Sequence, residues 1–169
     1  MSEYQYYEFR TIDRPLTETE IDALGAISTR AEITSTSFTN HYEWGDLKAD
    51  PLKLLEKYFD AFVYVANWGT RRFCLRLPKA WIDYEKVERM LPGDSVWAQR
   101  TAKHVIVGFE ISELEPDDLD DGTTWMGALI SLRSDCSAAI SGVSTWGGFC
   151  GRKMVSWTKD NLNPRFLAV

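Results

Sequence analysis

The sequence lacks the features by which several classes of protein are recognised. Its 169 residues include three cysteines and no Cys-x-x-Cys pair, which argues against a disulfide framework and against a cysteine zinc site. This cysteine usage favours a reducing cytoplasm. No run of about 18 apolar residues is present, so we expect no membrane-spanning helix and no membrane partner. The N-terminal residues 1–4 do not have the basic-then-apolar pattern of a secretion signal.

Motifs that mark common enzyme and nucleotide-binding classes are also missing. The chain contains no Gly-x-Gly-x-x-Gly, Walker A, Gly-x-Ser-x-Gly or His-Glu-x-x-His sequence, and only two histidines. We therefore lean towards a protein that is not an enzyme, and expect no cofactor and no metal. The net charge of −6 argues against extended contact with a nucleic-acid backbone.

What the sequence does have is a globular composition, with 44% hydrophobic and 13% aromatic residues. In the segment 4–11, Tyr4 and Tyr6 would face one side of a strand, and Tyr7 and Phe9 the other. Aromatic rings on both faces suit the interior of a sheet. Thr17 and Glu20 form a capping-box pattern, and Asp50-Pro51 is a second helix start. The first half is predicted to contain a strand at 4–11, a helix at 18–29, a strand at 32–43 and a helix at 52–66.

The second half continues with alternating apolar positions and turn residues. It predicts a strand at 71–77, a helix at 84–91, a hairpin at 95–100 and 104–111, and a short helix or strand at 125–132. Together these elements predict an α+β fold, with a mixed sheet of about five strands and helices covering one face. A doubly wound parallel sheet is the alternative, but no glycine-rich turn follows the first strand.

Patterning also predicts how the chain is organised. Residues 1–112 are expected to form the core domain and 113–135 an acidic loop with a short element. The tail, 136–169, shows no helical or strand period. We interpret the acidic run as a solvated loop, because it lacks the ligand spacing of a calcium-binding EF-hand.

Two sets of residues are candidates for chemistry. His41 and Glu43 alternate on one predicted strand and Asp46 follows it, so the three could hold a metal or form an acid–base pair. A plain polar strand end is the favoured interpretation. Arg72 and Arg76, together with Arg100, could form a basic patch that binds an anion or, as a third hypothesis, a nucleic-acid phosphate. The favoured alternative there is the solvated face of a sheet.

Several segments resemble an uncharacterised family of longer bacterial proteins. They are Tyr4–Phe9 (YQYYEF), Ile12–Thr17 (IDRPLT), Tyr58–Phe62 (YFDAF) and Ala66–Thr70 (ANWGT). The resemblance covers about residues 1–135 and implies no catalytic residues. We therefore expect a non-enzymatic cytoplasmic interaction module with an unknown protein partner. The alternative is a small enzyme or anion-binding protein using the His41/Glu43 strand end and the Arg72/Arg76 face.

Beyond residue 135 the chain departs from that family, and we hypothesise a truncated copy whose tail is read in a shifted frame. A shift of one base can convert codons for residues 145–157 into an amphipathic, family-like segment. We expect the coding nucleotide sequence to contain that segment in a neighbouring frame. Its absence from both other frames would refute the hypothesis.

Overall fold

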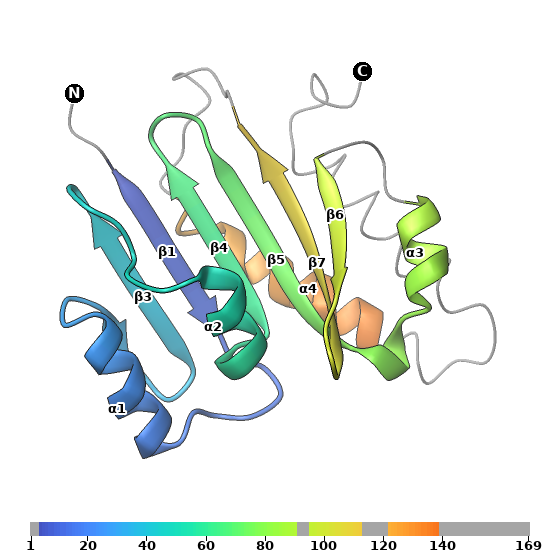
Figure 1. Ribbon diagram of the computed structural model, residues 1–169, viewed down its shortest axis with the longest axis horizontal. Coiled ribbons are helices and arrows are strands. Elements are labelled where there is room, and N and C mark those ends of the chain that lie inside the picture. Colours follow the sequence, from blue (N-terminus) through green and yellow to red (C-terminus); the bar gives the residue numbers. More distant parts are fainter. Residues whose placement is uncertain (1–3, 91–94, 113–121, 139–169) are drawn as a thin grey trace.

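The computed structural model describes residues 4–90, 95–112 and 122–138 (Figure 1). The strands are β1 (Gln5–Arg10), β2 (Glu32–Ile33), β3 (Ser37–Tyr42), β4 (Ala61–Ala66), β5 (Arg71–Pro78), β6 (Val96–Arg100) and β7 (His104–Ile111). The helices are α1 (Glu18–Ile27), α2 (Pro51–Tyr58), α3 (Tyr84–Met90) and α4 (Trp125–Ala138), with a single 3-10 turn at Lys79–Trp81. In these described residues no helix is both long and apolar enough to cross a membrane.

The strands form one sheet in the order β2-β3-β1-β4-β5-β7-β6. Every strand pairing in the described residues is antiparallel. The α+β class is therefore confirmed, but the sheet has seven strands rather than about five and is not mixed. The doubly wound parallel alternative is wrong for the same reason. The central position of β1, between β3 and β4, agrees with rings on both of its faces.

The predicted helix at 52–66 is wrong in its second half. Asp50 does cap α2, accepting hydrogen bonds from the backbone N–H groups of Leu52 and Lys53, and the helix ends at Tyr58. The following residues form β4, an interior strand buried on both faces. Such a strand is a continuous apolar run, and over a short segment this run has no periodicity that separates it from a buried helix.

The predicted strand at 32–43 is interrupted. The Thr34 and Ser37 hydroxyls lie 2.6 Å apart, and the Thr34 N–H donates to the Ser37 carbonyl, which folds the chain back between β2 and β3. Hydroxyl side chains compete in this way with regular ladder bonds. The predicted helices at 18–29 and 84–91 correspond to α1 and α3, and the predicted strand at 71–77 corresponds to β5. The predicted hairpin at 95–100 and 104–111 corresponds to β6 and β7.

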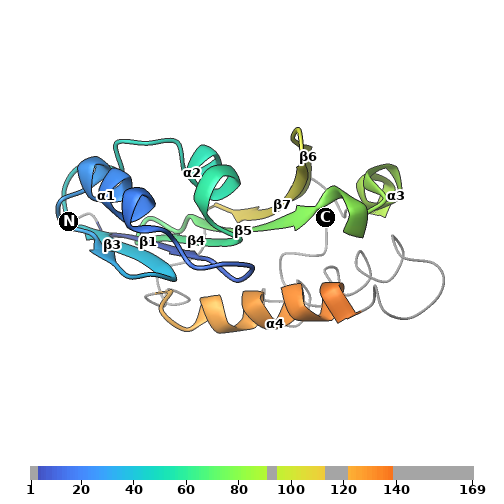
Figure 2. The same ribbon diagram turned by 90° about the horizontal axis from the view of Figure 1, so that it is seen from below.

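Helices cover both faces of the sheet. Figure 2 shows α1 and α2 on one side and α4 on the other, so the expectation of helices on one face only is wrong. The α1/α2 side encloses Phe9, Phe38, Phe59 and Phe62. The pairs of these rings that contact one another have centroid distances between 4.4 and 6.4 Å. All four are fully buried.

Helix α4 closes the second core and crosses the expected boundary between residues 135 and 136. Met126, Leu129 and Leu132 pack on the sheet beside side chains of β4, β5 and β7. Gly122, with a φ of +81°, lets the chain approach closely before α4, since a Cβ there would lie 2.5 Å from Val65 Cγ2. Most of the predicted acidic loop and tail, 113–121 and 139–169, lies outside the described residues.

A buried carboxylate connects the two layers. Asp60 is 1% exposed and precedes β4. It accepts hydrogen bonds from the backbone N–H groups of Ile12 (2.6 Å) and Asp13 (3.0 Å) and from Arg76 Nη2 (2.6 Å). Arg133 of α4 lies 3.5 Å from the same carboxylate and forms a bidentate pair with Asp13 at 2.7 and 2.8 Å. The network therefore holds α4, β5 and the β1–α1 connection together.

The balance of forces on Asp60 favours its ionised form. Burial alone raises the pKa of this carboxyl, but the Asp13 and Ile12 amides and the Arg76 and Arg133 guanidinium groups outweigh it, so the pKa lies below its ordinary value. A depressed folded pKa stabilises the protein above the unfolded pKa of about 3.9. That stability is lost as the pH falls through the lower folded value.

We predict that Asp60→Asn lowers the free energy of unfolding by about 3–5 kcal/mol at neutral pH, because it removes the charge between two guanidinium groups. Denaturant unfolding at a series of pH values measures this. The loss should shrink as the pH falls below about 4, where the unfolded wild-type carboxyl takes up a proton, and it should vanish only below the lower pKa of the folded state. Glu85→Gln, in an exposed pair with Arg89, serves as the control and should change stability by less than about 0.5 kcal/mol. Equal effects of the two substitutions would contradict the role given to Asp60.

Candidate binding pocket

The residues His41, Glu43 and Asp46 do not converge. The His41 ring packs against Tyr4 and Tyr6 at centroid distances of 6.0 and 4.9 Å, and Tyr6 belongs to the core on the α4 side. Asp46 accepts a hydrogen bond from Tyr7, which faces α1 and α2. Glu43 is exposed in the turn after β3. The loop after β3 thus carries Asp46 over the sheet face opposite to the one that His41 occupies.

The three arginines also fail to form one patch. Arg72 makes a bidentate pair with Glu110 at 2.9 and 3.0 Å, and Arg76 is bound in the Asp60 network. Arg100 lies over the Tyr84 ring at 5.4 Å, on the opposite face of the sheet. Each guanidinium is therefore held by a partner within the fold, and the predicted basic face is not present.

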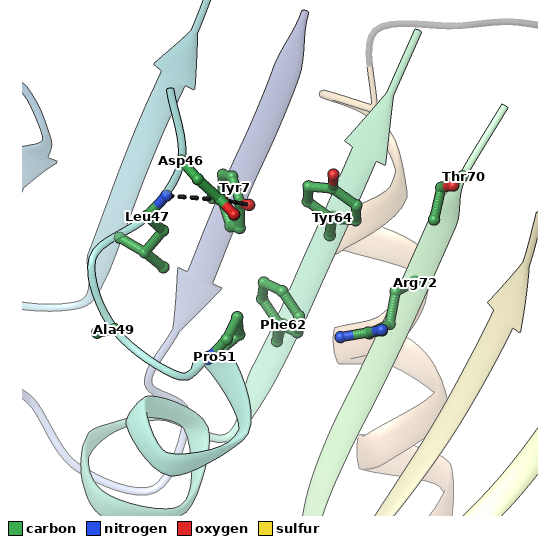
Figure 3. A pocket seen from close by; sticks show the side chains of 9 residues that line it. All are labelled: Tyr7, Asp46, Leu47, Ala49, Pro51, Phe62, Tyr64, Thr70 and Arg72. Atoms are coloured by element: carbon green, nitrogen blue, oxygen red, sulfur yellow. Dashed lines mark hydrogen bonds between the residues drawn. The ribbon is translucent and has the colours of Figure 1, made fainter. Parts of the chain in front are cut away.

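The structure instead shows a pocket on the α1/α2 side of the sheet. Its cavity of about 310 Å³ is lined by Tyr7, Phe62, Tyr64 and Arg72 from three adjacent strands. Asp46 stands at the rim, on the side of the pocket away from Arg72 (Figure 3). Helix α2 and the loop before it form one wall. The volume lies at the small end of the range for sites that bind small molecules.

Strand register determines which side chains form the floor. Tyr7 pairs with Tyr64 between β1 and β4, and Tyr64 pairs with Arg72 between β4 and β5. Their side chains therefore stand in one row across the sheet. The Tyr7 and Tyr64 rings lie 4.7 Å apart at an interplanar angle of 50°. Phe62 is two residues before Tyr64 and shares its face.

Gln5 fastens the loop to this floor. Its Nε2 donates to the carbonyl of Gly45 at 2.7 Å, while its Oε1 lies 3.0 Å from the hydroxyls of both Tyr7 and Tyr64. Gly45 has a φ of +86°, a conformation that glycine adopts without steric cost. The turn presents Asp46, whose Oδ1 accepts from the Tyr7 hydroxyl (2.5 Å) and the Leu47 N–H (2.7 Å).

The electrostatics keep these phenols neutral. Burial raises the pKa of Tyr64 to about 12, with the Asp46 charge adding to the shift. Burial and the hydrogen bond to Asp46 also raise the pKa of Tyr7 well above its ordinary value. Phenols that stay protonated at physiological pH act as hydrogen-bonding groups rather than as bases. Glu110 raises the pKa of Arg72 and keeps its guanidinium charged.

A second hollow of about 350 Å³ lies on the other side of the same loop. It is lined by Ser28, Arg30, Tyr42 and Lys48, with the exposed Trp44 at its edge. Asp46 borders both hollows. Lys48 borders only the second one, so the two hollows differ in charge.

Sequence reasoning found part of this pocket but assigned the wrong neighbours. Asp46 and Arg72 are candidates from the sequence, whereas Tyr7 is expected on an interior strand and Tyr64 on the polar strip of the predicted helix at 52–66. The available signal was their hydroxyl groups, which need hydrogen-bond partners when buried. In the part of the chain that the structure describes, no cluster of three or more His, Cys, Asp or Glu side chains could hold a metal ion.

Comparison with protein-family models, curated proteins and solved structures gives no match for this chain. The resemblance to a bacterial family therefore stays a prediction.

The raised pKa of Tyr64 makes a prediction for alkaline pH. A folded pKa above the unfolded value of about 10 contributes stability below pH 10, which is lost as the pH rises through about 12. The Tyr64→Phe variant should therefore lose about 2 kcal/mol less stability than wild type between pH 10 and pH 12. Denaturant unfolding at the two pH values tests this, and parallel stability curves for the two proteins would refute it.

Proposed function

We propose that this chain is a non-enzymatic interaction module of the bacterial cytoplasm, and that its recognition point is the Tyr7–Tyr64 pocket. The observation that carries the proposal is the way Gln5 joins two phenols of the floor to the loop of the rim. These bonds hold the pocket in shape before any ligand arrives, which lowers the entropic cost of binding.

The contents of the pocket fit recognition better than catalysis. Three aromatic rings provide an apolar floor, and fixed hydroxyl and carboxylate groups provide orientation. The Tyr7 and Tyr64 protons are engaged with Gln5 and Asp46 and stay in place at neutral pH. The cavity volume suits a molecule with a single ring, or one side chain of a protein partner.

The alternative of an enzyme or anion-binding protein has less support. His41 and Glu43 lie away from the pocket, and Arg76 is engaged by Asp60. Arg72 does line the pocket, but Glu110 balances its charge. Cys74 is a free thiol that is fully buried, and burial raises its pKa, so it stays protonated and does not supply a nucleophile for an enzyme.

Fragment screening by protein NMR tests the proposal. A library of single-ring fragments, neutral and charged, is added to the ¹⁵N-labelled chain, and the backbone amide shifts are mapped. We expect shifts concentrated at Tyr7, Leu47, Tyr64 and Arg72. The matched substitutions are Ala49→Phe, which fills the pocket from its wall, and Ala23→Phe on the exposed side of α1.

Ala49→Phe should abolish the shifts at these four residues, and Ala23→Phe should leave them unchanged. Shifts that persist in Ala49→Phe, or that map to the hollow beside Trp44 instead, would place recognition elsewhere and reject the proposal.

A further inference from the structure

At its Asp46 end, the pocket presents more hydrogen-bond acceptors than donors. The Tyr7 hydroxyl has one proton but lies within hydrogen-bonding distance of both Asp46 Oδ1 (2.5 Å) and Gln5 Oε1 (3.0 Å). The Tyr64 proton points to the same Gln5 oxygen. The phenolic lone pairs and the second Asp46 oxygen remain as acceptors. A ligand that complements this rim must bring donors.

The fixed charges have the same preference. Arg72 is paired with Glu110 through two hydrogen bonds, so this end of the pocket is close to neutral. Asp46 forms no ion pair with a described cationic side chain, and Lys48 on the same loop lines the other hollow. The Asp46 carboxylate therefore presents a ligand in this pocket with a negative charge that no described cationic side chain neutralises.

The floor provides a third contribution. Tyr7, Phe62 and Tyr64 line the cavity together, and their rings pack at centroid distances of 4.7 Å (Tyr7–Tyr64) and 6.4 Å (Tyr7–Phe62). Aromatic faces attract ammonium groups through the quadrupole of the ring, and they also pack against apolar portions of a ligand. Figure 3 shows Asp46 above Tyr7 at the rim, on the side of the pocket away from Arg72.

We infer that the ligand of this pocket is an organic cation, an amine in its ammonium form attached to a small aromatic or aliphatic body. The inference rests on the proposed function and adds the chemical class of the ligand. The ammonium donates to Asp46 and the Tyr7 hydroxyl oxygen, and the apolar body lies over Tyr64, the partly exposed ring of the floor. Because Asp46 is at the exposed rim, the carboxylate keeps part of its hydration and the charge preference is modest.

Three probes of nearly equal shape test the charge: benzylammonium, benzyl alcohol and benzoate. NMR titration of the ¹⁵N-labelled full chain at neutral pH and low salt gives a dissociation constant for each. We expect benzylammonium to bind at least about threefold more tightly than benzyl alcohol, and benzoate to bind most weakly.

Asp46→Asn keeps an oxygen that accepts from Tyr7 and Leu47 but removes the charge. It should remove the advantage of benzylammonium over benzyl alcohol, and Asp22→Asn on exposed α1 should preserve it.

The outcomes separate the two proposals. If benzyl alcohol or benzoate binds in the pocket as tightly as benzylammonium, the inference of a cation is wrong and the proposed function stands. An advantage of benzylammonium that survives Asp46→Asn also overturns it. If none of the probes shifts Tyr7, Leu47, Tyr64 or Arg72, both the inference and the proposed function fail.

Discussion

The carboxylate of Asp60 is the contact on which the arrangement of layers depends. It lies where β4 begins, and it binds the β1–α1 connection, β5 and α4 at once. Arg133 is buried against the sheet beside two carboxylates, Asp13 and Asp60, which compensate the charge of its guanidinium. Hydrophobic packing brings α4 to the sheet, and this network fixes where along the sheet it lies.

The pocket depends on a different constraint, the antiparallel register of β1, β4 and β5. Register aligns Tyr7, Tyr64 and Arg72 in one row, and the same row would be scattered by a shift of one residue, which turns each side chain to the other face. Gln5 then uses one amide group to hold the row and the loop together. The pocket is thus lined by side chains that also form the core of the sheet.

Much of the fold could be predicted from local pattern. The capping box of Thr17 and Glu20 and the cap at Asp50, both expected from the sequence, are present. The prediction failed for residues 59–66, because the continuous apolar run at 61–66 agrees with either a helix or a strand. For 125–132 the pattern left a helix and a strand open, and the structure has the helix α4 over Trp125–Ala138. Its place comes from a face of the sheet that the pattern did not reveal as uncovered.

The amino-acid sequence by itself determined the α+β class, most element positions and the residues that fill the core, because these follow from side-chain periodicity and from capping within a few residues. Only the tertiary structure decided that Asp46 meets Tyr7 rather than His41, that Arg72 meets Glu110, and that Arg76 meets Asp60. Those pairings join residues 16 to 39 positions apart, and strand order and register select them. Local periodicity contains no information about which strands become neighbours.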